Sequence, residues 1–546
     1  MLLLLAAPSR VSVAQDLAAQ RARRVDSLFS RFDSTASPGL AVAVVREGRV
    51  LLSKGYGLAS LEQRVPITSS TVFDVASVSK QFTGLAVAML VAQGKVGLRD
   101  DIRRYIPELR DQGRTITIDH LLHHTSGLRD WAATLAIAGW RFDDVISFDQ
   151  ILWMAFRQAT LNFAPGEQYS YSNTEYNLLA EMVARVTGQS FRAWTDEHIF
   201  GPLGMTRTHF RDDHTQVIPQ RAFSYARASD GSYHLATDNL TALGSSSLFS
   251  TADDLAKWVM NFDHATVGGD SAMALMRTRG VLNDGSVIPY AFGVFHGEHR
   301  GLPTISHDGS WASFRSLVVD FPLQHCGVVV LANTGSIDVT RAAYAVADIV
   351  LGKELAPLAA PGPAAQAVEV APDILETYVG LYRLGPGWYV RIRREGTELK
   401  TRATREPEYP MTPRSDSEFW VEGYHSTMVF NRGSPGDTTY LTYRGKRYPK
   451  LAESEPLTPA QLAAFAGQYD SDELQTSYGV EVRDSSLVMQ HPRYGAVTLT
   501  RLWRDEFAGS PWFMNVQFLR DEAGRVVGLA MTAGDRSRNN RFDKRR

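Results

Sequence analysis

Ser77 and Lys80 form the first group whose residue types and spacing could carry chemistry. Apolar residues follow at helical spacing up to Gly94, so the pair is predicted to open an amphipathic helix that ends at that glycine. A serine at a helix N-terminus has a backbone N–H directed to where an oxyanion could bind, and a lysine three residues later lies on the same face. For the lysine to act as a base near neutral pH, its pKa must fall from about 10.4 to about 7. This shift corresponds to about 4.6 kcal/mol of free energy favouring the neutral amine, which burial can supply. A helix-capping serine followed by a surface lysine is the alternative interpretation.

The second group is Tyr171 and Asn173, in a segment that is predicted to be extended and to precede a helix ending at Gly188. Residues two apart point to the same side of an extended chain and can reach one cavity. There the tyrosine could relay a proton to or from Ser77, and the asparagine could donate a hydrogen bond to a substrate carbonyl. The alternative is a loop tyrosine packed on the core and an asparagine that caps the helix.

The third group is His307, Gly309 and Ser310. The glycine would let another backbone or a substrate come close to an edge strand, and the backbone N–H of Ser310 is a candidate oxyanion donor beside that of Ser77. An isolated histidine of this kind is more simply explained as a turn residue with its hydrogen bonds satisfied.

The elements that would position these groups form an α+β domain. Residues 39–45 and 50–53 are predicted to pair as a hairpin around Glu47 and Gly48, and residues 327–333 to form a buried central strand. The pattern between them is mostly helical. The sheet should therefore take strands from both ends of the segment.

A Pro/Ala-rich linker at residues 356–370 separates this domain from an internal repeat. Residues in the first copy recur 87 or 88 positions later. Each copy alternates short aromatic or β-branched runs with turn residues, which predicts two small antiparallel β-barrels, at residues 371–455 and 456–546. At the spacing of 87, the first copy has Pro372, Leu375, Tyr378, Gly380 and Tyr382, and the second copy has Pro459, Leu462, Phe465, Gly467 and Tyr469 at the equivalent positions.

Composition excludes several classes of function. A net charge of −2 provides no global field to attract nucleic acid or an anionic membrane, and the single cysteine, Cys326, excludes an intramolecular disulfide. No segment has the length of apolar sequence that a membrane span needs. Residues 1–14 are interpreted as the remnant of a signal peptide, which predicts a periplasmic or secreted protein; a frayed cytosolic N-terminus is the alternative.

The three groups, in this order, resemble the motifs of the serine β-lactamase and penicillin-binding-protein superfamily, in the branch of class C β-lactamases, D-aminopeptidases and family VIII esterases. Residues 38–44, 118–128 and 248–255 also look like that branch, and the resemblance covers roughly residues 20 to 352. It implies a β-lactamase/transpeptidase-like catalytic domain, which we place at residues 15–355. Two barrels behind such a domain are similar to the lipocalin-like domains of bacterial D-aminopeptidases, which help to shape the active site.

The resemblance also implies a role for each group. Ser77 would be the acylated nucleophile, with Lys80 and Tyr171 as base and proton relay. The amides of Ser77 and Ser310 would form the oxyanion hole, and substrate would be held by Asn173, His307, Gly309 and Ser310. No cofactor and no metal are implied.

One departure bears on the substrate. Where β-lactamases and D,D-carboxypeptidases carry a lysine that attracts a carboxylate, this sequence has His307, which is mostly neutral at pH 7. Arg315 could compensate if it faces the same way. The motif is similar to that of D-aminopeptidases and some esterases, which favours substrates recognised by an amine or by an apolar acyl group.

We therefore expect a serine hydrolase that acts on a small peptide, amide or ester through an acyl-enzyme, most simply a D-aminopeptidase-like peptidase. A family VIII-type carboxylesterase or a β-lactamase/D,D-carboxypeptidase is the alternative among enzymes, and a catalytically silent binding protein is the alternative outside them. A metallohydrolase using His120, His123 and His124 is a further hypothesis, because their spacing could suit zinc. A homo-oligomer is left open.

Overall fold

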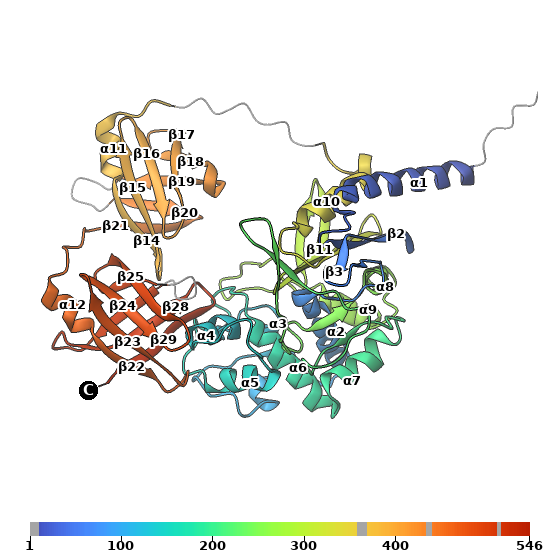
Figure 1. Cartoon of the computed structure of the whole chain (residues 1–546), viewed down its shortest axis with the longest axis horizontal. Helices are drawn as coiled ribbons and strands as arrows, with labels where there is room; N and C mark the ends of the chain where they lie inside the picture. The colour runs from blue at the N-terminus through green and yellow to red at the C-terminus, as the bar shows by residue number, and fades with distance from the viewer. Residues whose placement is uncertain (1–9, 358–367, 433–438, 510–514, 546) are drawn as a thin grey trace, which may run out of the picture. The chain divides into compact units, whose positions relative to one another are not determined.

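The computed structural model describes residues 10–357, 368–432, 439–509 and 515–545, so most of the predicted signal-peptide remnant and of the predicted linker lies outside the described residues. By its internal contacts the chain divides into two compact units (Figure 1). One unit contains Met1–Trp131 and Arg141–Leu358, and the other contains Ala132–Trp140 and Ala359–Arg546. The domain boundaries given above remain predictions. In the described parts of the chain, every helix is too short or too polar to cross a membrane.

A six-stranded antiparallel sheet forms the centre of the first unit. The predicted hairpin is confirmed, and Glu47 and Gly48 form its turn with φ values of 50° and 69°. The predicted central strand is also confirmed, since it pairs with the N-terminal strand on one side. In sheet order the strands are β10 (Phe295–His299), β11 (Leu302–Trp311), β12 (Phe314–Phe321), β13 (Cys326–Ala332), β1 (Leu40–Arg46) and β2 (Arg49–Tyr56).

Helices cover both faces of this sheet. In β1, Ala41, Ala43 and Val45 face the larger core, which includes α2 (Ser79–Ala92), α6 (Asn173–Thr187), α8 (Ala252–His264) and α9 (Gly269–Met276). The alternate residues of β1 face the opposite core with α1 (Arg10–Phe29) and α10 (Val339–Leu351). The first unit is thus a three-layer α+β structure.

Shorter elements complete the first unit. The helices are α3 (Ile118–Leu122), α5 (Phe148–Arg157) and α7 (Phe191–Thr195), and α4 (Trp131–Ile137) crosses into the second unit. The short strands are β3 (Leu58–Ser60), β4 (Val65–Pro66), β5 (Phe73–Asp74), β6 (His209–Phe210), β7 (Tyr225–Arg227), β8 (Tyr233–Leu235) and β9 (Leu248–Ser250).

Helix α2 differs from the prediction in one respect. Gly94 follows its end with a φ of 70°, as expected. However, the helix is buried on almost every side, including the polar Lys80, Gln81 and Thr83. It packs against α6 and α9 as well as the layer of the sheet, so its polar side chains are there to meet buried partners and do not form a solvated face.

The second unit contains two closed antiparallel barrels of eight strands each, as predicted. The first follows α11 (Pro372–Tyr378) and comprises β14 (Gly380–Gly385), β15 (Trp388–Glu395), β16 (Glu398–Ala403), β17 (Glu408–Pro413), β18 (Glu418–Val421), β19 (Ser426–Asn431), β20 (Tyr440–Tyr443) and β21 (Lys446–Leu451). The second follows α12 (Pro459–Phe465) and comprises β22 (Gly467–Ser471), β23 (Thr476–Arg483), β24 (Ser486–His491), β25 (Gly495–Trp503), β26 (Glu506–Ala508), β27 (Asn515–Arg520), β28 (Val526–Ala533) and β29 (Ser537–Lys544).

The sequence repeat has a physical basis in both barrels. Tyr382 and Tyr469 occupy equivalent places, and each hydroxyl donates to the carbonyl four residues earlier, at 2.9 and 2.6 Å. Gly380 and Gly467 have φ values of 153° and 149°, and a Cβ on either would meet a lysine side chain at 2.6 or 2.7 Å. Each barrel thus repeats one way of joining its short helix to its first strand.

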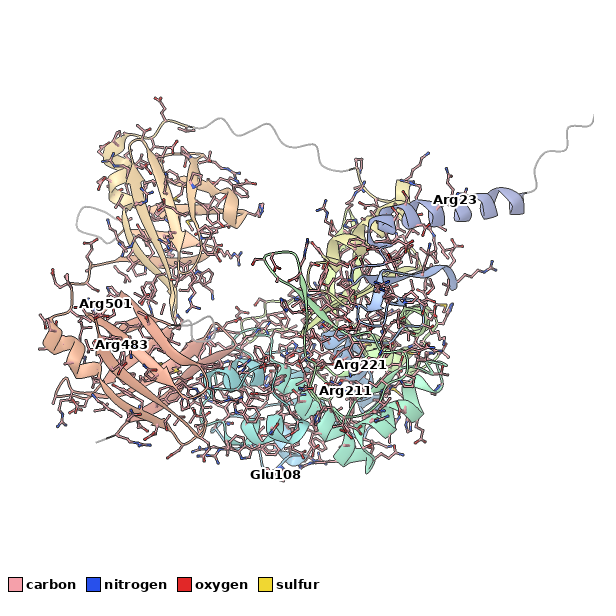
Figure 2. All side chains as sticks on the ribbon, viewed as in Figure 1. Arg23, Glu108, Arg211, Arg221, Arg483 and Arg501 are labelled. Atoms are coloured by element: carbon pink, nitrogen blue, oxygen red, sulfur yellow. The ribbon has the colours of Figure 1, made fainter. Side chains whose placement is uncertain are left out.

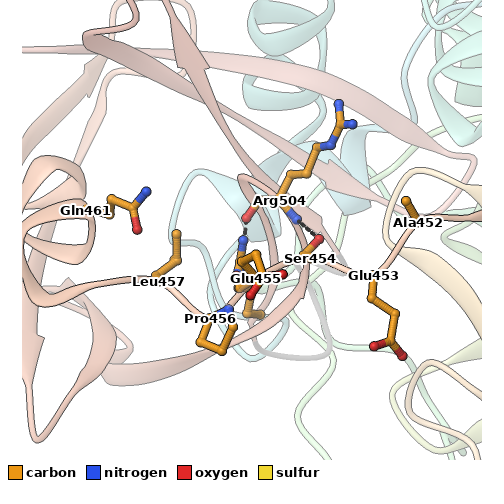
Figure 3. Close-up of a pocket in the computed structure, with 9 residues that line it drawn as sticks. Ala452, Glu453, Ser454, Glu455, Pro456, Leu457, Gln461 and Arg504 are labelled. Carbon is orange, nitrogen blue, oxygen red and sulfur yellow. Dashed lines mark hydrogen bonds between the residues drawn. The ribbon is translucent and has the colours of Figure 1, made fainter.

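Hydrogen bonds at the rim of the second barrel hold residues 452–457, the segment that connects the two barrels. The backbone N–H of Arg504 donates to Ser454 Oγ at 3.1 Å (Figure 3). Arg501 donates to the carbonyl of Glu455 at 2.5 Å. They surround a hollow of about 270 Å³ lined by residues 452–457, Gln461, Arg501 and Arg504. Its polar groups hold the connection between the barrels.

Candidate active site

Ser77 lies in a 3-10 turn (Ala76–Val78) immediately before α2, which itself begins at Ser79. Ala76 has a φ of 47°, and its backbone N–H donates to Asp74 Oδ1 at 2.7 Å. On the other side, Ser316 Oγ of β12 donates to the carbonyl of Val75 at 2.7 Å. The strained turn before Ser77 is therefore held by a carboxylate and by the sheet.

Lys80 is fully buried and its amine contacts three oxygen atoms. Nζ donates to Asn173 Oδ1 and to the carbonyl of Ser245, both at 2.8 Å, and lies 3.1 Å from Ser77 Oγ. A neutral amine has two N–H groups and one lone pair. If the N–H groups serve the two shorter contacts, the lone pair faces the Ser77 hydroxyl and can accept its proton.

Asn173 is the first residue of α6, and its amide is held at both ends. Oδ1 accepts from Lys80, while Nδ2 and the backbone N–H donate to Asp130 Oδ2 at 2.7 and 2.8 Å. The N-cap residue of α6 is Ser172, so the alternative interpretation of Asn173 as the cap is wrong. Asp130 fixes the orientation of the amide that faces Lys80.

The ring of Tyr171 lies beside these groups. Its centroid is 4.8 Å from Lys80 Nζ and 6.1 Å from the imidazole of His307. The structure thus brings all three sequence groups together around Ser77.

Gly309 contacts the turn that carries Ser77. A Cβ added there would lie 2.3 Å from the carbonyl of Val75 and 3.1 Å from the backbone nitrogen of Ser77, so the strand makes the close approach that we predicted. Strand β10 pairs with residues 302–306 of β11, and residues 307–311 continue beyond its end. This part of the strand carries Ser310, the other candidate oxyanion donor.

His307 is buried on the same face of β11 as Gly309. Its Nδ1 lies 2.6 Å from the carbonyl of Asp308, so Nδ1 carries the proton, and Nε2 accepts from the Tyr290 hydroxyl at 3.1 Å. Burial, the largest cause, lowers the pKa of His307 to about 4. The imidazole is therefore neutral at pH 7.

Arg315 does not take over the place of the missing lysine. In β12, Phe314, Ser316 and Val318 face the Ser77 side, whereas Leu317 and Val319 face the opposite core. Arg315 has the parity of the latter pair, and its guanidinium lies beside Gly335. Arg315 therefore lies on the far face of the sheet.

A buried polar cluster lies behind Tyr171. His124 Nδ1 is 2.5 Å from Glu175 Oε2, and Ser126 contacts the other oxygen of that carboxyl through both its hydroxyl and its N–H. The His124 ring is 4.3 Å from that of Tyr171, and burial raises the pKa of Glu175 well above its usual value. The His124 ring of this cluster therefore packs against the ring of Tyr171.

The three histidines considered for zinc have separate partners. His120 Nδ1 accepts from the N–H of Thr117, His123 contacts the carbonyls of Asp119 and Thr278, and His124 contacts Glu175. In the part of the chain that the structure describes, three potential metal ligands do not gather anywhere.

Sequence reasoning missed Asp130, Ser245 and Tyr290. Each reaches the site from a segment with no motif, and the Ser245 contact is made by the backbone carbonyl, which any residue could supply. For Asp130 the only available signal was its place just after the 118–128 segment.

The family described as Beta-lactamase matches residues 22–351 of this chain. A D-aminopeptidase from Gluconobacter oxydans (strain 621H) is 29% identical over 309 residues, which cover 57% of this chain and 58% of that protein. Penicillin-binding protein 4* of Bacillus subtilis (strain 168) is 25% identical over 446 residues, which cover 77% of this chain and 96% of that protein. The octameric penicillin-binding protein homologue from Pyrococcus abyssi has a similar fold, with a TM-score of 0.54 and 20% identity over 89% of this chain and 100% of its own.

Proposed function

Because the chain belongs to the beta-lactamase family, we propose that it is a serine hydrolase that cleaves amide or ester bonds through an acyl-enzyme. Ser77 Oγ attacks the substrate carbonyl carbon while its proton passes to the Lys80 amine, with Tyr171 as the nearby proton relay. The oxyanion rests on the amides of Ser77 and Ser310. The leaving group takes a proton and departs, and water then attacks the acyl-enzyme to release the acid.

The observation that carries this proposal is the placement of the Lys80 amine. It is buried beside Ser77 Oγ, at 3.1 Å, and it also donates to the uncharged oxygen atoms Asn173 Oδ1 and the Ser245 carbonyl. Burial favours the neutral amine over the ammonium, and a neutral amine is what a base requires.

The charges around the site bear on the substrate. His307 is neutral at pH 7, and Arg315 lies on the far face of the sheet, so neither residue supplies the fixed cation that would attract a substrate carboxylate. This supports a peptide, amide or ester without a carboxylate at that position, and it weakens the case for penicillins and for C-terminal D-Ala.

An aromatic cluster at the end of β11 favours a substrate that carries an apolar group. Trp311 shares the face of β11 that carries His307 and Gly309, and its ring centroid lies 5.7 Å from Phe142 and 6.1 Å from Trp131. Its Nε1 donates to Asp238 Oδ1 at 3.1 Å. Asp238 in turn pairs with Arg211 at 2.9 Å and Arg221 at 3.0 Å, two arginines of the first unit that are labelled in Figure 2. The indole is thus held firmly at the end of the strand.

We place D-aminopeptidase-like cleavage of peptides with an N-terminal D-residue first, supported by the His-x-Gly motif and by the relative named D-aminopeptidase. A carboxylesterase is the second candidate, favoured by the same apolar cluster and the same neutral histidine. Export to the periplasm or outside the cell remains a prediction. Assembly into a homo-oligomer stays open, and the octameric homologue is in line with it.

Two measurements test the proposal. A fluorophosphonate probe should label the wild type and Ser286→Ala, which alters an exposed turn serine, but not Ser77→Ala. Intact-mass analysis should then locate the adduct on Ser77. Labelling that persists in Ser77→Ala would remove this serine as nucleophile, and absence of labelling in the wild type would favour the silent binding protein.

Comparing kcat/KM for D-alanine p-nitroanilide with kcat/KM for short p-nitrophenyl esters separates the two enzyme candidates. Measurable anilide cleavage supports the peptidase. Ester cleavage without anilide cleavage would leave the carboxylesterase.

A further inference from the structure

Residues 242–247, which we call the Ser245 loop, precede β9 and supply the carbonyl that accepts from Lys80. The whole loop is buried, although it belongs to neither a helix nor a strand. Buried backbone groups outside regular structure must find partners elsewhere, because an unpaired buried carbonyl is costly. The partners of this loop therefore decide how its carbonyls are directed.

Three successive carbonyls of the Ser245 loop each accept a hydrogen bond of 2.8 Å from a side chain of α2 or α6. The pairs are Asn177 Nδ2 of α6 with Leu243, Thr83 Oγ1 of α2 with Gly244, and Lys80 Nζ of α2 with Ser245. Thr83 lies three residues after Lys80, on the same face of α2. The first two hydrogen bonds thus fix the peptide units next to the one that faces the lysine.

Other contacts fix where the loop lies. Gly244 has a φ of 85°, and a Cβ there would lie 2.4 Å from the carbonyl oxygen of Tyr176 and 2.6 Å from the Cβ of Ala180, so the loop backbone rests directly on α6. At the base of the loop, Ser247 Oγ accepts from the N–H of Ala242 at 2.8 Å. The base and the glycine hold the loop in place, and the two side-chain donors set the direction of its carbonyls.

Only one end of the Asn177 amide is used. The side chain is completely buried, and among the described residues its Oδ1 has no hydrogen-bond partner. A buried amide oxygen without a partner lowers stability. The donor end, directed at Leu243, is therefore the part of this side chain that the loop depends on.

We propose that Thr83 and Asn177 are positioning residues for the reaction, and that they act by directing the Ser245 carbonyl at the Lys80 amine. The inference rests on the proposed function for its readout in turnover. A neutral amine has two N–H groups, and its lone pair is held toward Ser77 only while both are engaged. When the Ser245 carbonyl turns away, the amine rotates and presents its lone pair less often. Both positioning side chains are completely buried and cannot touch the substrate, so the effect is on kcat and not on KM.

The first test compares substitutions of Thr83 that differ in the hydroxyl. Thr83→Val keeps the shape and loses the donor, and with the p-nitrophenyl ester or p-nitroanilide that the wild type cleaves it should lower kcat about tenfold and change KM less than about twofold. Thr83→Ser keeps the donor and should retain kcat within about twofold. The matched control is Thr195→Val in α7, because that hydroxyl is also buried and donates to a backbone carbonyl, at Phe191, and kcat should not change.

Two outcomes of this comparison would overturn the proposal. One is a loss of kcat in Thr83→Ser as large as that in Thr83→Val, since the hydroxyl would then not be the group that matters. The other is a loss in Thr83→Val no larger than that in Thr195→Val.

Asn177→Leu tests the second donor and separates the loop from the stability of the fold. It removes the hydrogen bond to Leu243 together with the unpaired amide oxygen, so thermal unfolding should change little while kcat falls about tenfold. In Thr83→Val/Asn177→Leu the loss should be smaller than the product of the two single losses, because both residues direct one carbonyl. Losses that multiply in full would contradict this shared route.

Hydrogen exchange examines the loop without turnover. The N–H of Ser246 donates to the carbonyl of Ala242 at 2.9 Å within the loop. The amides of residues 242–247 should exchange faster in Thr83→Val and in Asn177→Leu than in Thr195→Val. If the wild type neither labels with the fluorophosphonate probe nor hydrolyses, the proposed function fails, and exchange alone decides whether the two side chains hold the loop: unchanged exchange would refute it.

Discussion

Gly309→Ala should abolish most activity by displacing the backbone amides on which the oxyanion would rest. The new Cβ would lie 3.1 Å from the backbone nitrogen of Ser77, one of the two candidate oxyanion donors. It would also lie 2.3 Å from both the carbonyl of Val75 and Ser316 Oγ. Since ordinary contacts begin near 3.4 Å, the strand or the turn must move by about 1 Å.

The magnitude follows from these two effects. Loss of one oxyanion donor costs about 10² to 10³ in kcat, and a shift of about 1 Å in a reacting group costs about 10²-fold. Overpacking of this kind destabilises a fold by about 1 to 3 kcal/mol, which a unit with so large a core can absorb. We therefore expect a folded protein with kcat reduced by at least about 10²-fold.

The assay is the rate of acylation, measured as burst kinetics with a p-nitrophenyl ester, together with thermal unfolding. Gly385→Ala in β14 is the matched control, because a Cβ there meets nothing within 4 Å, and it should leave both measurements unchanged. If Gly309→Ala acylates within about threefold of the wild-type rate, the assignment of the oxyanion site beside Ser77 is wrong.

Three further predictions concern Lys80, Trp311 and Asp320. Lys80→Met should lower kcat about 10³-fold, and full turnover without the amine would contradict its role as base. Trp311→Ala should lower kcat/KM for D-phenylalanine p-nitroanilide about tenfold more than for D-alanine p-nitroanilide; equal losses would show that the indole does not contact the substrate side chain. Burial, with a smaller contribution from Asp263, raises the pKa of Asp320 to about 8, so the folded state binds the extra proton and stability falls as pH rises from about 4 to 8. Asp320→Asn removes this loss of stability. Its free energy of unfolding relative to wild type should rise by about 1.4 kcal/mol per pH unit in urea titrations at pH 5, 6 and 7. A difference that stays constant with pH would count against the raised pKa.

Local patterns were enough to predict the main elements. The hairpin at Glu47 and Gly48 follows from turn chemistry, the end of α2 follows from Gly94, and the two barrels follow from the repeat that places Tyr382 and Tyr469 in equivalent positions. In each case the signal lies within a few residues or recurs at a fixed spacing.

The parts that could not be predicted depend on contacts between distant segments. Nothing in the sequence near Lys80 indicates that the Ser245 carbonyl accepts from its amine or that Asp130 orients Asn173. An amphipathic pattern predicts a solvated face for the polar residues of α2, whereas these residues are buried. Residues 132–140 read as an ordinary part of the catalytic region, whereas their packing assigns them to the unit of the barrels. Burial and partner choice of this kind are tertiary properties.

The pairing of β1 with β13 has a consequence for how the protein matures. Gly39 donates to Asn333 across this junction, although the two residues are 294 positions apart. During synthesis the N-terminal hairpin emerges from the ribosome long before the strand that it must join, and it waits with one apolar, unpaired edge. The nascent chain therefore has reason to need a chaperone until β13 has emerged from the ribosome and paired with β1.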